Sequence, residues 1–97
     1  MTTRESILST LRRERSKLRE HFGVKRVALF GSYARGDQTE SSDVDILVEV
    51  DPSIGLRFVA LADHLESLLG VRTDVVSRGA INLPHWQLIE PELVDVE

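Results

Sequence analysis

Two short apolar segments on either side of a polar loop constrain the fold of this 97-residue chain more than any other feature. The first, "VKRVALFG" at 24–31, is rich in valine and closes on glycine. The second, "DVDILVEV" at 43–50, stops before Asp51 and Pro52. Apolar runs this short, bounded by glycine, proline and polar residues, are typical of buried strands rather than helices. We therefore expect two strands, joined by a tight turn and a polar loop.

Apolar residues at helical spacing predict one helix before these strands and another after them. Thr2 and Glu5 have the spacing of a capping box, and the first helix should end at Gly23. The second helix is expected over 55–69, with Gly70 as its C-terminal cap. A third strand is predicted at 71–77, a short helix begun by a proline at 83–93, and a last strand at 93–97. The apolar face of the first helix should consist of Ile7, Leu8, Leu11, Leu18 and Phe22.

Length and composition set further bounds. A chain of 97 residues predicts one domain, residues 1–97, with no room for a separate substrate-binding domain. No apolar stretch is long enough to span a bilayer, and the N-terminus has no signal-peptide pattern, so we expect a cytoplasmic protein that does not enter a membrane. The absence of cysteine excludes disulfides and thiolate metal sites. The net charge of -4 argues against direct, non-specific binding of nucleic acid.

The turn after the first strand has the features of a phosphate-binding site. Gly31 lacks a side chain, so a ligand can approach the backbone there. A short helix is expected to begin at Ser32. The Ser32 hydroxyl group and the first backbone N–H groups of this helix would donate hydrogen bonds to an anion.

Asp43 and Asp45 lie two residues apart at the start of the second strand. Side chains at this spacing point to the same face of a strand, so two carboxylates are brought together. The repulsion between them favours a cation, and oxygen ligands favour Mg²⁺ or Mn²⁺. For an isolated pair, the alternative is that one aspartate faces solvent and the other caps a turn. The adjacent Gly-Ser turn favours the metal interpretation.

These residues carry a family resemblance. Gly31-Ser32, ten intervening residues and then Asp43-Val44-Asp45 resemble the G-S-x10-D-x-D signature of the polymerase-β-like nucleotidyltransferase superfamily. The surrounding "GSYARG" and "SDVDILVE" resemble the minimal nucleotidyltransferases, many of which act as the antitoxin beside a HEPN-domain ribonuclease toxin. The resemblance implies an α/β (α+β) fold in which helices back a mixed sheet. It also implies two Mg²⁺ ions and a third carboxylate on the adjacent strand.

The resemblance assigns roles to individual residues. Asp43 and Asp45 would hold both metal ions, and Asp74 in "VRTDVV" would be the third ligand, nearer the attacking nucleophile. A lone aspartate at position 74 would otherwise be interpreted as the cap of an edge strand. Gly31 and Ser32 would seat the nucleotide triphosphate. Arg35 and Ser42 are further candidates for nucleotide binding, although an exposed arginine is as readily explained by a salt bridge.

The function implied is transfer of a nucleoside monophosphate, AMP from ATP, to a hydroxyl group of a partner protein. By the same resemblance the acceptor is a tyrosine of a HEPN toxin, with which the chain would form a hetero-oligomer; a homo-oligomer is the other arrangement considered. One alternative is an antitoxin that neutralises the toxin by occlusion without catalysis. Another is an enzyme acting on a small molecule, but such relatives normally carry an additional substrate domain.

Three other features were interpreted from the residues alone. The basic run "RRERSKLR" at 12–19 could attract RNA or an acidic partner, but basic residues opposite an apolar stripe are usually a solvated helix face. The three histidines share no metal-ligand spacing and are assigned no role. Trp86 is either the apolar anchor of the last helix or part of a partner surface.

Overall fold

The amphipathic N-terminal segment forms helix α1 (Arg4–Phe22) in the computed structural model, which describes residues 2–97. The capping box lies one residue later than predicted, because Thr3 rather than Thr2 is the N-cap and Ser6 rather than Glu5 completes it. The Ser6 backbone N–H donates to Thr3 Oγ1, and the Thr3 N–H donates to Ser6 Oγ. A serine hydroxyl thus replaces the usual carboxylate. The helix ends at Gly23, as predicted.

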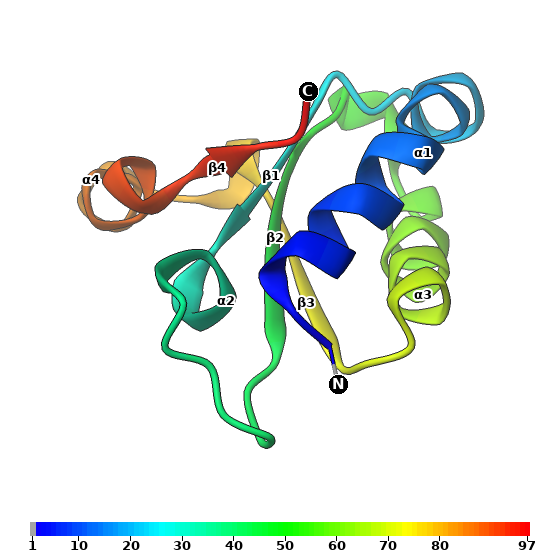
Figure 1. Ribbon diagram of the computed structural model, residues 1–97. Helices are drawn as coiled ribbons and strands as arrows, with labels where there is room; N and C mark the ends of the chain where they lie inside the picture. The colour runs from blue at the N-terminus through cyan, green and yellow to red at the C-terminus, as the bar shows by residue number, and fades with distance from the viewer. Residues whose placement is uncertain (1) are drawn as a thin grey trace.

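The strands form one mixed sheet with the order β3-β2-β1-β4 (Figure 1). Strand β1 (Arg26–Phe30) pairs antiparallel with β2 (Val44–Glu49) on one side and with β4 (Val94–Asp95) on the other. Strand β3 (Thr73–Ser77) pairs parallel with β2. The expected mixed sheet backed by helices is therefore confirmed, and the D-x-D strand lies in its interior.

Helices α1 and α3 (Arg57–Leu69) cover one face of the sheet (Figure 1). The core on this face takes alternate residues of β2, including Val44 and Ile46, which are fully buried. Helix α3 begins two residues later than predicted because Pro52–Ile54 forms a separate 3-10 turn and Gly55 follows with φ of +54°. It ends before Gly70, as predicted.

The opposite face of the sheet is covered over only part of its area. Helix α4 (Leu83–Ile89) places Trp86 against Ala28 and Leu47 on this face. The short helix α2 (Gly31–Arg35) follows β1 directly and leads into the polar loop (Figure 1). The residues of β2 that face this side near its N-terminal end are left accessible, and this is where the aspartates lie.

The C-terminal segment returns to the sheet through a 3-10 turn, Glu90–Glu92, and the two-residue strand β4. Arg26 holds it there, because Nε and Nη2 donate to Asp95 at 2.7 and 3.1 Å and Nη1 donates to Glu49 at 3.1 Å. These charged contacts supplement a backbone ladder of only two residue pairs. Across residues 2–97, no helix has the length and apolar character needed to cross a membrane.

Candidate active site

The glycine that ends β1 adopts a conformation few other residues tolerate. Gly31 has φ of +75° and begins α2, whose five residues are GSYAR. Phe30 is the N-cap of α2 and makes no side-chain capping hydrogen bond. The first amides of α2 therefore have no side-chain cap from the described part of the chain. This arrangement matches the predicted turn, although whether it seats a phosphate stays a prediction.

A side chain at position 31 would also collide with an aspartate. A Cβ atom built on Gly31 would overlap Asp45 Oδ2 and lie 3.0 Å from Asp45 Cγ. The absence of a side chain at Gly31 therefore leaves room for the Asp45 carboxylate as well as for any ligand. Only the second of these reasons is apparent from the sequence.

The sheet brings two of the three predicted aspartates to adjacent positions. Asp45 is the register partner of Phe30 on β1 and of Asp74 on β3. Register partners on neighbouring strands present their side chains on the same face of the sheet, so Asp45 and Asp74 lie side by side. Asp43 precedes β2 by one residue and, at a spacing of two from Asp45, belongs to the same side.

The surroundings of Asp45 disfavour its ionised form. The pKa of Asp45 is raised above its ordinary value, first by burial and then by the negative charges of Asp74, Asp43 and Glu92, while Arg35 opposes the shift. Desolvation and like charges both disfavour the ionised form. The physical consequence is that a cation placed among these carboxylates would relieve the repulsion.

The aspartates are not already arranged as a metal-binding cage. Asp43 Oδ1 lies 3.6 Å from Nε of the exposed Arg72, which provides a local counter-charge. No group of three or more His, Cys, Asp or Glu side chains is in position to hold a metal ion within residues 2–97. The donor set nevertheless fits Mg²⁺ or Mn²⁺ in type, since all three side chains offer carboxylate oxygens from one side of two adjacent strands. Like charges without a cation between them are expected to stay apart.

Arg35 and Ser42 both make internal contacts. Arg35 Nε donates to Asp37 Oδ2 at 3.1 Å, and Nη1 donates to both oxygens of Glu92 at 3.2 and 3.0 Å. The salt-bridge interpretation of Arg35 is thus observed, and phosphate binding stays a prediction. Ser42 Oγ accepts a hydrogen bond from the Thr39 backbone N–H at 2.8 Å and closes the polar loop. Nothing in the local sequence singled out Glu92, which lies 57 residues from Arg35.

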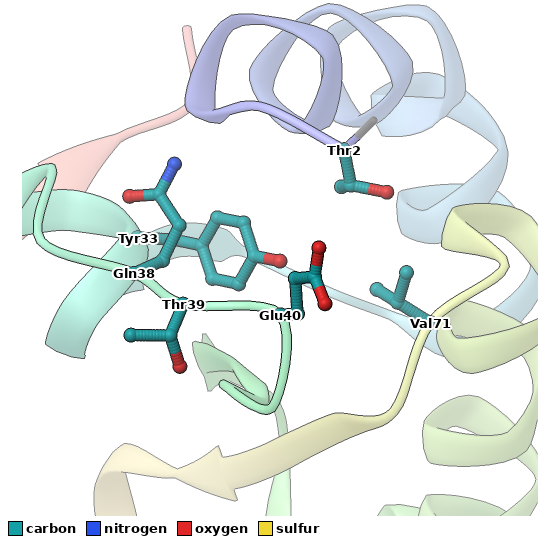
Figure 2. Close-up of a pocket in the computed structure, with 6 residues that line it drawn as sticks. All are labelled: Thr2, Tyr33, Gln38, Thr39, Glu40 and Val71. Carbon is teal, nitrogen blue, oxygen red and sulfur yellow. The ribbon is translucent and has the colours of Figure 1, made fainter.

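Two hollows flank the polar loop. One, of about 480 Å³, is drawn in Figure 2, where Glu40 lies between the Tyr33 ring and Val71. A second, of about 460 Å³, shares these three residues and extends to Asp43. Tyr33 and Val71 belong to the core on the α1 and α3 side of the sheet. Asp43 lines the second hollow, whereas Asp45 and Asp74 line neither.

Trp86 is the anchor of the last helix. It is only 9% exposed, and the Arg78 guanidinium lies 3.9 Å from the centre of its ring. The suggestion that Trp86 is an exposed partner contact was therefore wrong. The small side chain of Ala28 leaves room for the indole against the sheet. Burial and a cation–π contact account for the residue without a partner.

Comparison with known proteins identifies the class to which this fold and this site belong. The model of the nucleotidyltransferase domain family matches residues 10–95. The protein adenylyltransferase MntA of Thermococcus cleftensis is 47% identical over 98 residues, which span 99% of this chain and 98% of that protein. The chain therefore belongs to the nucleotidyltransferase domain family, and within it to the minimal nucleotidyltransferases of the MntA-like protein adenylyltransferase type.

Solved structures agree with this assignment. A structure described as a minimal nucleotidyltransferase superposes with a TM-score of 0.78 and 34% identity, covering 96% of this chain and 95% of the other. A toxin-antitoxin structure with AMP-PNP superposes with a TM-score of 0.68 and 26% identity, covering 89% of this chain and 72% of the other. The fold predicted from the sequence is thus confirmed.

Proposed function

We propose that this adenylyltransferase moves AMP from ATP to a tyrosine hydroxyl of a partner toxin of the HEPN ribonuclease family and thereby acts as its antitoxin. The observation that carries the proposal is the juxtaposition of Asp45 and Asp74 as register partners, with Gly31 directly beside Asp45. The toxin-antitoxin structure with AMP-PNP supports the choice of partner and nucleotide. We further propose that chain and toxin form a hetero-oligomer.

The proposed reaction breaks a phosphoanhydride bond of ATP and forms a phosphoester bond to the acceptor. The acceptor oxygen forms a bond to the α-phosphorus of ATP, and the bond from that phosphorus to the bridging oxygen breaks to release pyrophosphate. Two Mg²⁺ ions held by Asp43, Asp45 and Asp74 would neutralise charge on the triphosphate and lower the pKa of the attacking hydroxyl. Asp74 would accept the hydroxyl proton. Ser32 and the first amides of α2 would bind the β- and γ-phosphates, with Arg35 and Ser42 at the rim.

Without a lid over the carboxylates, the acceptor protein would have to complete the site. Asp45 and Asp74 line neither of the neighbouring hollows, and α4 covers the sheet only beside them. Exclusion of water would therefore depend on the partner, and ATP hydrolysis by the chain alone should be slow. We expect the contact surface to include the rim of the Gly31-Ser32 turn and the polar loop at 37–42.

Nucleotide transfer and toxin binding can be measured separately. The purified chain is mixed with the product of the neighbouring toxin gene and with α-labelled ATP and Mg²⁺, and label on the toxin is measured together with complex formation. We expect Asp45→Asn to reduce transfer by about two orders of magnitude or more because a metal ligand is lost. Folding should be intact or slightly more stable without metal, because a repelling charge is removed. Asp63→Asn, on an exposed position of α3, is the matched control.

The same experiment separates catalysis from occlusion. If Asp45→Asn binds the toxin and still neutralises it fully, occlusion is the mechanism and the enzymatic account of antitoxin action fails. If Asp45→Asn transfers label to the toxin as fast as the wild type does, the assignment of the metal site fails.

A further inference from the structure

Two arginines fasten the C-terminal segment to the rest of the molecule, and each contacts one carboxylate of that segment and one from elsewhere. Arg26, the first residue of β1, contacts Asp95 and Glu49. Arg35, at the end of α2, contacts Glu92 and Asp37. The two clamps are chemically alike but lie at opposite ends of β1, and only the second is next to the aspartates.

The clamp on Arg35 leaves part of the guanidinium available. Nε is used by Asp37 and Nη1 by Glu92, whereas Nη2 donates no hydrogen bond to any residue from 2 to 97. Because a guanidinium is a rigid planar fork, fixing it through two nitrogens also fixes the direction of the third. Arg35 ends the five-residue helix that Gly31 begins, so the Cα atoms of the two residues are separated by about 6 Å along the helix axis.

Glu92 is thus in contact with a cation that acts on Asp45, although it comes from the C-terminal segment of the chain. Its carboxylate is close enough to act electrostatically on Asp45, as Arg35 also does. A free arginine side chain with 47% exposure would sample many rotamers, and binding a phosphate would require ordering it. The two hydrogen bonds that Nη1 donates to Glu92 restrict the Arg35 side chain before any nucleotide binds.

We propose that Glu92 is a positioning residue for nucleotide binding, which holds Arg35 so that its Nη2 edge meets the triphosphate of ATP. The inference rests on the proposed function, because it takes the Gly31-Ser32 turn as the triphosphate seat. It assigns to the C-terminal segment a role in binding ATP, although that segment contains none of the three aspartates.

The experiment is calorimetric titration of the full chain with AMP-PNP and Mg²⁺, which reports binding without turnover. We expect Glu92→Gln to weaken binding by about tenfold, as loss of a charge-assisted contact to Arg35 would. Arg35→Ala should weaken binding by a similar or larger factor. Adding Glu92→Gln to Arg35→Ala should change nothing further, because Glu92 acts only through Arg35.

Asp95→Asn is the matched control, since it breaks the corresponding clamp at the other end of β1. It should leave the affinity for AMP-PNP unchanged while lowering the thermal unfolding midpoint. A merely structural role for Glu92 predicts instead that Asp95→Asn and Glu92→Gln weaken binding alike, and that Glu92→Gln still does so without Arg35.

Each other result has a distinct meaning. Unchanged affinity in Glu92→Gln overturns the inference, and so does tighter binding, which would mean that Glu92 competes with phosphate for Arg35. If the wild-type chain binds AMP-PNP and Asp45→Asn abolishes the Mg²⁺-dependent part, the proposed site stands whatever Glu92 does. If the wild-type chain does not bind AMP-PNP at all, both the inference and the proposed function fail.

Discussion

Two glycines lie at the ends of helix α2, and both have a left-handed backbone conformation, but only one of them lies against a site aspartate. Gly31 and Gly36 have φ of +75° and +83°, a region that side-chain-bearing residues rarely adopt. A Cβ atom on Gly36 would meet nothing within 4 Å, whereas one on Gly31 would overlap the end of the Asp45 side chain. Asp45 is flexible enough to move away, so the added atom at position 31 should displace the carboxylate.

We therefore expect Gly31→Ala and Gly36→Ala to lose similar stability, about 1–2 kcal/mol each, from the left-handed backbone conformation. Only Gly31→Ala should also lose nucleotide transfer, by about a hundredfold, because it moves a catalytic carboxylate. Chemical denaturation measures the first quantity and labelled-ATP transfer the second. Equal loss of transfer in the two variants would contradict this account.

The shortest strand provides a test at the scale of a structural element. Strand β4 has only two residues, and Arg26 holds Asp95 through two hydrogen bonds. This contact lowers the pKa of Asp95 below its ordinary value of 3.8. A carboxyl whose pKa is depressed by folding adds stability that is present above its unfolded pKa. That stability is lost as the pH falls through the folded pKa, which here lies below 3.8.

Asp95→Asn should accordingly unfold at a lower temperature than the wild type at pH 7, and the difference should shrink only below about pH 4. Thermal unfolding of both proteins between pH 7 and pH 2 measures it, with the exposed substitution Asp63→Asn as a control. The difference should be small because both side chains of the pair are partly exposed. If the difference in unfolding temperature between the two proteins disappears well above pH 4, another titrating group is responsible.

Most elements were predictable because their signals are local. Apolar residues three or four apart predicted α1 and α3, and valine-rich runs closed by glycine or proline predicted β1 and β2. The error in the capping box has a local cause too: Thr2 and Thr3 are equally suitable N-caps, and Ser6 is not the glutamate that the usual pattern requires. Helix α3 was expected from residue 55, but Gly55 is the C-terminal cap of the 3-10 turn at Pro52–Ile54, and the helix begins at Arg57.

At the site, the sequence is informative where a strand's period of two decides the geometry. Asp43 and Asp45 could be placed on one side of the sheet from their spacing, whereas Asp74 was found only through the family resemblance. The contact between Arg35 and Glu92 spans 57 residues and depends on where the C-terminal segment returns, which no local pattern specifies. Burial of Trp86 likewise depends on Ala28, a small residue 58 positions earlier. No local pattern in the sequence indicates that these two residues pack together.

At the scale of the whole molecule, charge is divided between the two sides of the sheet. The chain carries a net charge of -4, yet α1 contains six Lys or Arg residues and three Glu residues. Helix α1 covers the face opposite α4 (Figure 1). Asp45 alternates along β2 with Val44 and Ile46, which face α1, so Asp45 and its register partner Asp74 lie on the α4 side. The basic side chains of α1 at 12, 13, 15, 17 and 19 are exposed, as a solvated helix face requires.

Reversing two of these charges should therefore have little effect. We expect Arg12→Glu combined with Arg13→Glu to leave nucleotide transfer to the toxin and the unfolding midpoint nearly unchanged, since surface changes of this kind usually alter stability by less than about 0.5 kcal/mol. The labelled-ATP assay and thermal unfolding test this directly. Loss of toxin binding in the double variant would instead identify α1 as part of the interface.

The pairing of Phe30 with Asp45 changes how the spacing of the sequence signature is understood. The backbone ladder between β1 and β2 sets the distance from Gly31 to the aspartates, so the ten residues between Ser32 and Asp43 need only bridge two points that are already fixed. Their number reflects the length of this connection, which includes most of α2 and the polar loop. The polar loop that follows α2 can therefore change in length while Asp45 keeps its place beside Gly31.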